Sequence, residues 1–566
     1  MNLGERFPQT VIPDQRPGYS GWIVAPETLP DVARMLRDEE DYRYLSSITG
    51  VDYLPEGKFE VVYHFFQPSG GPALVVKTRV ARDEPALPSL TPVFPGAEFQ
   101  EREIWDLFGI RFIGHPDPRR ILLWEGFSGH PLRKDWREPL YEEDAKPFAS
   151  RWPAGNAGGK SDDGYVRPAE GAPPDGWESQ DNRALYAALE SASQARSGAL
   201  QTERLTINLG PQHPSTHGVF RIAALLDGEN VIDLKPVMGY LHRCHEKIGE
   251  RNTFLANIPF TDRLDYLTSL SNNFGYVLAV EKLMGIQPPE RANYLRVILA
   301  ELTRIVSHLW SIGFLLNDLG AFFTPALYAI EERELVLDIF EAVTGSRMMC
   351  NFFRFGGLAR DVPDDILERI RGLIEERLPR KVDELDFYLT ENEILKERCI
   401  GVGMLSAEQA VAYSAAGPVL RASGVPYDVR RAEPYSVYDR LDWKVACRDG
   451  GDVYDRYRVR LDEIRQSIRI VRQALHDLPG GEILAGKPQY QVRVPPGEAY
   501  GRVEGPKGEL GFYVVSSGAP NPWRYHVRAP SFINLTSMAE MCRGQKVADV
   551  VAVLGSIDII LGETDR

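Results

Sequence analysis

Residues 208–221 read Asn-Leu-Gly-Pro-Gln-His-Pro-Ser-Thr-His-Gly-Val-Phe-Arg. This stretch combines His213 and His217 with two hydroxyl side chains, and its glycines and prolines constrain the backbone. Strand-like patterns flank it on both sides, and a third follows after a turn: 204–209, 219–226 and 231–237. We therefore expect a small antiparallel sheet whose first connection is a stiff loop that carries proton donors.

Helical patterns dominate the chain beyond this sheet. Apolar residues recur at three- and four-residue spacing in six segments: 262–284, 289–320, 325–344, 363–377, 380–393 and 452–476. A second small sheet is expected at 497–515, and the last strong apolar run is 547–561. The first three helices would form the core of a bundle, so we predict a mainly α domain with small β-sheets.

The beginning of the chain has a different pattern. A helical segment at 30–43 is followed by strand-like runs at 59–66 and 73–80. These elements predict a compact α+β domain over residues 1–145.

The segment 146–200 has the composition of a linker. It is dense in glycine, proline and charge and poor in branched apolar residues, so it cannot bury enough surface to offset its ordering entropy. One short helical patch, 182–196, interrupts it. We predict a multidomain protein in which a flexible linker joins domain 1–145 to domain 201–566.

Composition disfavours several classes of function. The 566 residues are 43% hydrophobic, enough for two or three domains. With 65 basic and 80 acidic residues, the net charge of -15 provides no field that would attract nucleic acid. Residues 1–8 lack the pattern of a signal peptide, and apolar stretches such as 310–316 are broken well before the roughly 20 residues of a membrane span. We expect a soluble, cytoplasmic chain without a nucleic-acid partner.

The five cysteines are scattered along the chain: Cys244, Cys350, Cys399, Cys447 and Cys542. None forms a Cys-x-x-Cys pair, the spacing that zinc and iron–sulfur sites commonly use. An odd number without a secretory signal also argues against a disulfide framework. We expect these thiols to serve as small apolar residues, with no metal or cluster held by this chain.

The two histidines of the first loop permit two interpretations. Histidine suits proton delivery because its unperturbed pKa lies nearest neutrality. Alternatively, the loop is held by local turns and histidine only fills it, and the residues alone favour neither interpretation. Nucleophilic catalysis by Ser215 is disfavoured because no Gly-x-Ser-x-Gly elbow surrounds it.

A second cluster contains His242, His245 and Glu246. On a helix these residues would lie at i, i+3 and i+4, where they could bind a metal. Their spacing differs from that of a His-Glu-x-x-His zinc helix, and no further ligand is evident. We therefore prefer a charged, partly buried helix face.

Three further residues attract attention. Asp262 and Tyr266 begin the predicted helix 262–284, where an aspartate is an ordinary cap and a tyrosine is an ordinary core residue. Asp318 lies among the apolar residues of 314–320, where a carboxylate needs a partner, and histidine is a natural one.

Several motifs together carry a resemblance to a known family. They are Gly210-Pro211-Gln212-His213-Pro214-Ser215-Thr216-His217-Gly218, His242-Arg243 with Glu246-Lys247, Asp262-Arg263-Leu264-Asp265-Tyr266, Gly401-Val402-Gly403, and Leu554-Gly555-Ser556-Ile557-Asp558 followed by Asp565-Arg566. From about residue 202 onward the chain resembles the D subunit of NADH:quinone oxidoreductase, respiratory complex I.

The N-terminal unit resembles the C subunit of the same enzyme. The motifs are Glu101-Arg102-Glu103-Ile104-Trp105-Asp106-Leu107-Phe108-Gly109-Ile110, His115-Pro116-Asp117, Arg119-Arg120, and Gly129-His130-Pro131-Leu132-Arg133-Lys134-Asp135-Trp136. The chain is therefore similar to a natural fusion of the C and D subunits.

This resemblance implies a site for a quinone head group. His217 and Tyr266 correspond to the pair that hydrogen-bonds the quinone, with Asp318 as the carboxylate behind the histidine. Donors that face the two carbonyl oxygens polarise the quinone and deliver protons, and the aspartate fixes the histidine tautomer. Arg243 corresponds to an arginine close to the terminal iron–sulfur cluster, which the neighbouring B subunit holds. Quinone is then the substrate, and no cofactor is bound by this chain alone.

The resemblance also implies partners and a location. Expected neighbours are the B and I subunits and other peripheral-arm subunits, with the membrane-arm H and A subunits near the quinone entrance. The chain would belong to the peripheral arm of a proton-translocating NADH:quinone oxidoreductase. It would be a peripheral membrane protein at the cytoplasmic face of the bacterial inner membrane.

Other functions are compatible with parts of the pattern. The D subunit is related to the large subunit of nickel–iron hydrogenases, which hold nickel with two Cys-x-x-Cys pairs. The corresponding stretches here, 262–268 and 558–563, contain no cysteine, so a nickel–iron centre is not expected. The remaining alternatives are a related complex with another electron donor, or a structural scaffold, which is the role expected of the C-like half.

The chain departs from the family pattern at two places. Cys244-His245 stand where many relatives have glycine and a variable residue, beside Arg243. Met349 stands where relatives commonly carry a histidine. If that histidine couples cluster reduction to protonation, the potential of the neighbouring cluster should depend little on pH here.

Overall fold

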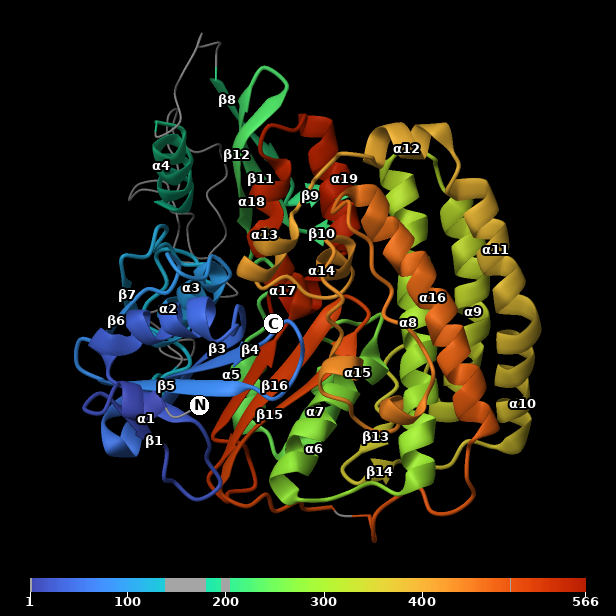
Figure 1. The fold of residues 1–566 in the computed structure, drawn as a ribbon, viewed down its shortest axis with the longest axis horizontal. Coiled ribbons are helices and arrows are strands. Elements are labelled where there is room, and N and C mark those ends of the chain that lie inside the picture. The colour runs from blue at the N-terminus through green and yellow to red at the C-terminus, as the bar shows by residue number, and fades with distance from the viewer. Residues whose placement is uncertain (1–2, 138–179, 195–203, 489) are drawn as a thin grey trace, which may run out of the picture.

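The computed structural model describes residues 3–137, 180–194, 204–488 and 490–566. In Figure 1 the N-terminal α+β unit lies on one side, a helical bundle lies on the other, and a second sheet runs between them. This arrangement confirms the predicted fold class of an α+β domain followed by a mainly helical region with small sheets. The predicted boundaries at 145/146 and 200/201, and residues 146–179 and 195–200 of the predicted flexible linker, lie outside the described residues.

A five-stranded sheet forms the N-terminal domain, in the order β1-β2-β5-β4-β3. Its strands are β1 (Val11–Pro13), β2 (Trp22–Val24), β3 (Tyr44–Tyr53), β4 (Lys58–Phe66) and β5 (Leu74–Ala81). The helices are α1 (Leu3–Arg6), α2 (Leu29–Glu39) and α3 (Ala97–Phe108), and a parallel pair comprises β6 (Ala86–Pro88) and β7 (Arg111–Ile113). Helix α2 buries Val32, Met35 and Leu36, one face at helical spacing. It ends four residues before the predicted Arg43, and Asp41 has a left-handed backbone that stops a helix.

The predicted sheet after residue 203 is present, with its three strands in the order β12-β11-β8. They are β8 (Arg204–Leu209), β11 (Arg221–Asp227) and β12 (Asn230–Val237). The first loop itself contains a short pair, β9 (Gln212–His213) and β10 (Gly218–Val219), with a 3-10 turn η4 (Pro214–Thr216) between them. Helix α4 (Gln180–Gln194), predicted as the patch 182–196, packs on this sheet.

The prediction of one helix over 262–284 was wrong at its start. Helix α6 (Phe254–Thr261) ends just before Asp262, and α7 (Ser269–Met284) begins seven residues later. Asp265 explains the interruption, because its carboxylate accepts a hydrogen bond from the backbone N–H of Leu267 at 3.0 Å and so forms a local turn. Residues 262–268 are therefore a connection that is buried except for Arg263 and Tyr266, and Asp262 caps no helix N-terminus.

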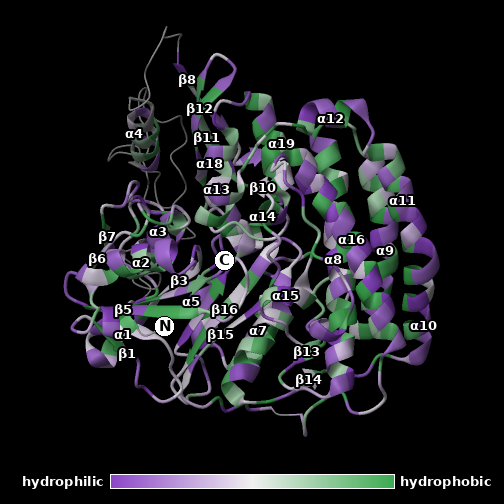
Figure 2. Cartoon of the chain, in the orientation of Figure 1, coloured by the Kyte–Doolittle hydropathy of each residue, from purple (hydrophilic) through white to green (hydrophobic). Residues whose placement is uncertain are grey.

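Long helices build the bundle on the far side. They are α8 (Glu290–Asp318), α9 (Thr324–Thr344), α10 (Asp364–Gly372), the π-helical turn η5 (Leu373–Arg377), α11 (Leu378–Leu389) and α16 (Val453–His476). Figure 2 shows hydrophobic and hydrophilic faces alternating on these helices, as expected for amphipathic segments around a shared core. Helix α8 has the length and composition of a membrane span, but 89% of its most apolar 18-residue stretch is buried inside the protein. Its apolar residues therefore form the centre of the bundle.

The last sheet joins the two halves of the molecule. It comprises β15 (Gly497–Gly505), β16 (Gly508–Ser516) and β17 (Arg524–Arg528), in that order. Its strand β17 faces the N-terminal domain: Arg524 donates from Nε to the carbonyl of Gly50 at 2.8 Å, and Arg528 donates from Nε to the carbonyl of Ser46 at 3.2 Å. One hydrophobic core runs through both parts.

Short elements complete the described chain. The helices are α5 (His245–Arg251), α12 (Glu393–Cys399), α13 (Ala407–Ala412), α14 (Pro418–Ala422), α15 (Val429–Ala432), α17 (Pro530–Asn534), α18 (Met538–Cys542), α19 (Val547–Ile557) and α20 (Leu561–Thr564). The remaining strands are β13 (Phe353–Arg354) and β14 (Gly357–Leu358), and the remaining 3-10 turns are η1 (Pro26–Thr28), η2 (Leu54–Glu56), η6 (Tyr438–Arg440) and η7 (Leu535–Ser537).

Candidate functional site

The loop 210–220 is held by its own side chains. His213 accepts a hydrogen bond at Nδ1 from the backbone N–H of Ser215 at 3.2 Å and so caps η4. The Thr216 hydroxyl lies 2.7 Å from the carbonyl oxygen of His213 and 3.0 Å from that of Gly218. These contacts leave His217 at the tip with a left-handed backbone, φ 53°, a conformation that only surrounding contacts sustain. His213 and Ser215 therefore shape the loop that presents His217.

His217 reaches the end of the long bundle helix. Its Nε2 lies 2.6 Å from Oδ2 of Asp318, the last residue of α8, and the two side chains are 19% and 7% exposed. Burial lowers the pKa of the His217 imidazole, but the hydrogen bond and charge of Asp318 outweigh burial and raise this pKa above its ordinary value. The imidazolium form is thus favoured, with one N–H donated to the aspartate.

Gly555 makes room for this pair. A Cβ atom at that position of α19 would lie 2.8 Å from Oδ2 of Asp318, closer than van der Waals contact allows. The glycine of the Leu-Gly-Ser-Ile-Asp motif thereby lets the carboxylate lie against a helix backbone.

Tyr266 lies in the turn 262–268 rather than on a helix. Its side chain is 37% exposed, whereas its neighbour Asp265 is buried. Partial burial raises the pKa of the Tyr266 phenol, and the negative charge of Asp265 raises it further. Tyr266 is therefore a protonated donor at the protein surface near neutral pH.

Helix α20 connects the His217 loop to the Tyr266 turn. A Cβ at Gly218, next to His217, would come within 2.8 Å of the Leu561 side chain. The following residue, Gly562, lies against the turn, where a Cβ would come within 2.3 Å of the carbonyl oxygen of Leu264. Segments separated by about fifty residues in the sequence thus meet on two successive residues of α20.

A buried charge cluster lies behind these segments. Lys507, between β15 and β16, places its Nζ 2.9 Å from Asp265 and 3.5 Å from Asp558, and the cluster also includes Glu563. Burial raises the pKa of Glu563 to about 7, with a contribution from the charge of Asp265. Burial also raises the pKa of Asp558, against the opposing effect of Lys507. The Lys507 cluster links electrostatically to both site residues, because Asp558 acts on His217 and Asp265 acts on Tyr266.

Arg243 lies between the Tyr266 turn and helix α20. Its Nη2 donates to the carbonyl of Arg263 at 2.6 Å and to the carbonyl of Gly562 at 3.1 Å. Desolvation lowers the pKa of the guanidinium, partly offset by Asp565, but an arginine remains charged. The structure therefore fixes a positive charge, exposed at the surface, beside the Tyr266 turn.

His242, His245 and Glu246 do not converge on a common point. His242 bonds to the carbonyl of Asp565 at 2.6 Å, and His245 bonds to the Tyr525 hydroxyl at 3.0 Å. Glu246 instead accepts hydrogen bonds from the Arg524 guanidinium at 2.6 Å and from the backbone of Val527 at 3.0 Å. The prediction of one helix face was wrong for His242, which precedes α5, whereas His245 and Glu246 are buried on that helix and bind neighbouring groups of the fold. Among the described residues, Glu246 does come close to Glu103 and His526, but Arg566 and Arg524 already bind the two carboxylates.

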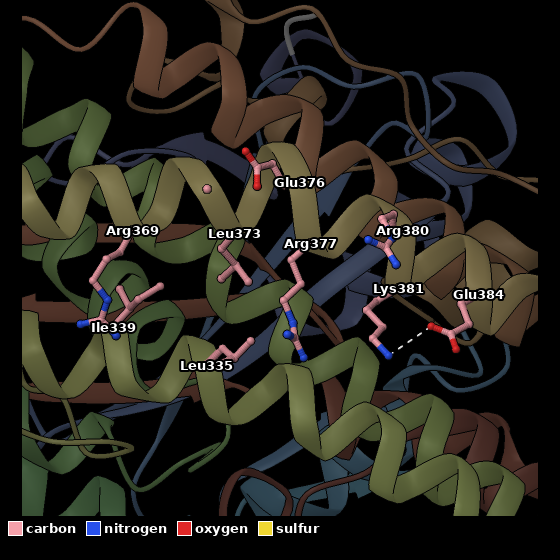
Figure 3. A pocket seen from close by; sticks show the side chains of 10 residues that line it. Leu335, Ile339, Arg369, Leu373, Glu376, Arg377, Arg380, Lys381 and Glu384 are labelled. Atoms are coloured by element: carbon pink, nitrogen blue, oxygen red, sulfur yellow. Dashed lines mark ion pairs between the residues drawn. The ribbon is translucent and has the colours of Figure 1, made fainter.

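A large hollow elsewhere in the bundle is separate from this site. A cavity of about 640 Å³ lies between α9 and the α10–α11 segment and is lined mainly by charged side chains (Figure 3). Two of the four cations that line it form ion pairs, since Lys381 pairs with Glu384 and Arg377 pairs with Glu332. None of the predicted site residues lines it.

The sequence identified some members of the site and missed others. The partner of Asp318 was indicated by its apolar surroundings, although 101 residues separate it from His217. Lys507 and Asp265 as a buried pair were missed. Lys507 follows Gly505-Pro506 in a tight connection, where a lysine is ordinarily solvated, so no local signal reveals its burial.

Comparison with known proteins gives matches for both halves. Residues 318–493 and 488–566 match the family model "Respiratory-chain NADH dehydrogenase, 49 Kd subunit", and residues 22–142 match "Respiratory-chain NADH dehydrogenase, 30 Kd subunit". The NADH-quinone oxidoreductase D subunit 1 of Roseiflexus sp. (strain RS-1) is 57% identical over 375 residues, which cover 65% of this chain and 100% of the relative. The NADH-quinone oxidoreductase D subunit 2 of Herpetosiphon aurantiacus is 55% identical over 370 residues, with the same two shares. The NADH-quinone oxidoreductase C/D subunit of Methylococcus capsulatus is 37% identical over 597 residues, which cover 100% of this chain and 96% of the relative.

Proposed function

Since the chain belongs to the fused C/D subunits of NADH-quinone oxidoreductase, respiratory complex I, we propose that His217 and Tyr266 bind and protonate the quinone. The observation that carries this proposal is the 2.6 Å contact of His217 with Asp318, in a loop that α20 joins to the exposed Tyr266 turn. The site belongs to the D-like half, and the C-like half serves as a scaffold.

The hydrogen-bond arrangement assigns a role to each nitrogen of His217. Nε2 is engaged by Asp318, so Nδ1 remains to face a quinone carbonyl. When Asp318 is ionised, Nδ1 donates a hydrogen bond only if the imidazole is protonated, and the raised pKa of His217 favours that form. After Nδ1 has delivered its proton, the neutral ring keeps its Nε2–H bond to Asp318 and therefore its orientation.

Tyr266 supplies the second donor. Reduction of a quinone to a quinol takes two electrons and two protons, so two donors aimed at the two carbonyl oxygens match the reaction. The raised pKa of the Tyr266 phenol keeps its proton in place until the electrons arrive. Ionisation of Tyr266 is opposed by burial and by the nearby charge of Asp265, so the protonated phenol is the favoured form once a proton is available.

Electrons would enter from the terminal iron–sulfur cluster of the B subunit. Arg243 is placed to contribute a fixed positive charge beside the Tyr266 turn, which would make reduction of that cluster easier. Cys350, Cys399 and Cys542 are buried, and burial raises the pKa of each thiol, which disfavours a role as thiolate ligands. The expectation that all five cysteines are small buried residues was wrong for Cys244, which is exposed.

The surroundings of Asp318 indicate how the site meets the membrane arm. The connection from α8 to α9 and the first turn of α9 expose four large side chains: Phe322, Phe323, Leu327 and Tyr328. An apolar surface of this kind beside the site suits contact with the H subunit at the quinone entrance. We accordingly place the chain at the cytoplasmic face of the bacterial inner membrane, next to the B, I, H and A subunits.

The hydrogenase alternative lacks its ligands. At the positions of the two cysteine pairs stand the turn 262–268 and the stretch 558–563, whose carboxylates are committed to Lys507 or to hydrogen bonds within the fold. Soft thiolates are what a nickel–iron centre requires. A site of oxygen and imidazole donors suits proton transfer to a quinone better.

The test is quinone turnover in the assembled complex. His217→Ala and Tyr266→Phe should each reduce quinone turnover, while electron transfer from NADH to an artificial acceptor that reacts upstream stays at the wild-type rate. Unchanged quinone turnover in both variants would contradict the proposal. Quinone turnover lost together with the artificial-acceptor reaction would show failed assembly, and the exposed control Val219→Ala in the same loop identifies that case.

A further inference from the structure

We propose that helix α4 is a clamp that positions the His217 loop, with Tyr186 and Asn182 as positioning residues. The helix lies within the segment predicted as the linker and outside the residues that either family model matches. It packs on strands β11 and β12, with β8 beyond them in the sheet (Figure 1). The proposal concerns the geometry of the loop, and its effect on quinone rests on the function proposed above.

One face of α4 is buried against the sheet. Leu185 and Leu189, one helical turn apart, are 2% and 0% exposed and form a small core with Ala223 and Leu225 of β11. This core is separate from the main core of the molecule. Burial of the two leucines supplies the free energy that keeps α4 docked.

The polar edge of α4 ties together the two strand ends from which the loop emerges. The Tyr186 hydroxyl accepts hydrogen bonds from Asn208 Nδ2 at 2.9 Å and from Arg221 Nη2 at 3.2 Å. Asn182 Oδ1 accepts a further bond from Arg221 Nη1 at 2.8 Å. Arg221 itself donates from Nε to Oδ1 of Asn208 at 2.8 Å.

These contacts have a direct geometric consequence for His217. Asn208 is the penultimate residue of β8, Arg221 is the first residue of β11, and the loop 210–220 spans the gap between them. The backbone ladder between β8 and β11 already pairs the strand ends, and two side-chain donors from these ends share one oxygen of α4, so Tyr186 adds a further restraint on their spacing. His217 lies four residues from Arg221 and needs this spacing to keep its contact with Asp318.

Helix α4 also touches the N-terminal domain. Asp181, in its first turn, accepts a hydrogen bond from the backbone N–H of Glu125 at 2.8 Å. The clamp is thereby anchored to the C-like half while it holds the sheet of the D-like half. Helix α4, which lies between the two domains in the sequence, is thus bound to the C-like half while it positions the His217 loop of the D-like half.

The experiment compares matched variants in the assembled complex. Tyr186→Phe removes only the shared oxygen, and Asn182→Ala removes the second acceptor. Asn182→Asp keeps an acceptor for Arg221 and should behave as wild type, as should Arg183→Ala, which alters an exposed side chain of the same helix. The two readouts are amide hydrogen exchange of residues 210–220 and the KM and kcat for quinone.

We expect faster exchange of residues 210–220 in Tyr186→Phe and Asn182→Ala, by about two- to twelvefold, the factor that the net contribution of a typical intramolecular hydrogen bond supplies. The KM for quinone should rise by a similar factor with a smaller change in kcat. Exchange equal to wild type in both variants would overturn the clamp, and so would an Asn182→Asp variant as mobile as Asn182→Ala. Faster exchange with an unchanged KM would uphold the clamp and count against quinone binding at His217, which separates the two proposals.

Discussion

Replacing Asp318 by asparagine tests the role of the carboxylate behind His217 without changing the size of the side chain. The contact between His217 Nε2 and Asp318 Oδ2 is 2.6 Å long, and the carboxylate is almost buried. A hydrogen bond to a charged group contributes about 1.5–3 kcal/mol. If this amount is lost from proton delivery, quinone reduction slows by about 10- to 150-fold.

The same substitution has a predictable effect on the pH dependence. Burial alone lowers the pKa of His217, and Asp318 is the main group that raises it, so Asp318→Asn should move the pKa below its ordinary value. Quinone turnover requires the imidazolium and should therefore fall at a lower pH in the variant than in the wild type.

The assay is NADH-dependent quinone reduction by the assembled complex across the range around neutrality, with an upstream artificial acceptor as reference. Asp338→Asn, which removes an exposed carboxylate from the adjacent helix α9, is the control. If Asp318→Asn reduces quinone as fast as the wild type, and its activity declines at the same pH, the proposed role of Asp318 is wrong.

Four other predictions concern buried charges and the neighbouring cluster. Burial raises the pKa of the Glu101 carboxyl to about 8 from an ordinary 4.5. The protonated carboxyl therefore contributes fully to stability below the pKa of the unfolded chain. This contribution is lost as the pH rises toward 8, by about 1.4 kcal/mol per pH unit. The midpoint temperature of thermal unfolding should therefore fall less steeply with pH in Glu101→Gln than in the wild type over that pH range. The same pH dependence in both proteins would contradict this prediction. Lys507→Met should lower the free energy of unfolding by about 3–5 kcal/mol in denaturant titrations, because Asp265 would lose its buried cation, and a loss below about 1 kcal/mol would disprove the pairing. In redox titrations, Arg243→Gln should lower the potential of the terminal cluster. The wild-type potential should vary little with pH if cluster reduction is coupled to protonation by the histidine that the family resemblance implies at the position of Met349. A steep pH slope in the wild type, or an unchanged potential in Arg243→Gln, would count against these two assignments.

Local patterns predicted the elements well where periodicity was strong. Helix α8 was expected at 289–320 and forms over Glu290–Asp318, and α16 was expected at 452–476 and forms over Val453–His476. Both helices carry long apolar stripes, so packing and propensity act together. The prediction of a helix over residues 262–268 was wrong because the side chain of Asp265 competes for a backbone N–H, an effect that apolar spacing does not reveal.

The candidate site divides in the same way. The residue types of the His217 loop and the apolar surroundings of Asp318 drew attention to both places, but only the family resemblance paired His217 with Asp318 and Tyr266. The Lys507 cluster was out of reach, because it brings together residues from the turn 262–268, the β15–β16 connection and the C-terminal segment. The positioning role of α4 was equally hidden, since Tyr186 and Asn208 meet only after the sheet has formed.

The most direct measurement is the structure of the assembled complex with quinone bound. We expect one carbonyl oxygen of the head group within hydrogen-bond distance of the Tyr266 hydroxyl, and the other facing Nδ1 of His217 while Nε2 keeps its contact with Asp318. A head group that is fully bound in the reduced complex but contacts neither Tyr266 nor His217 would contradict this expectation.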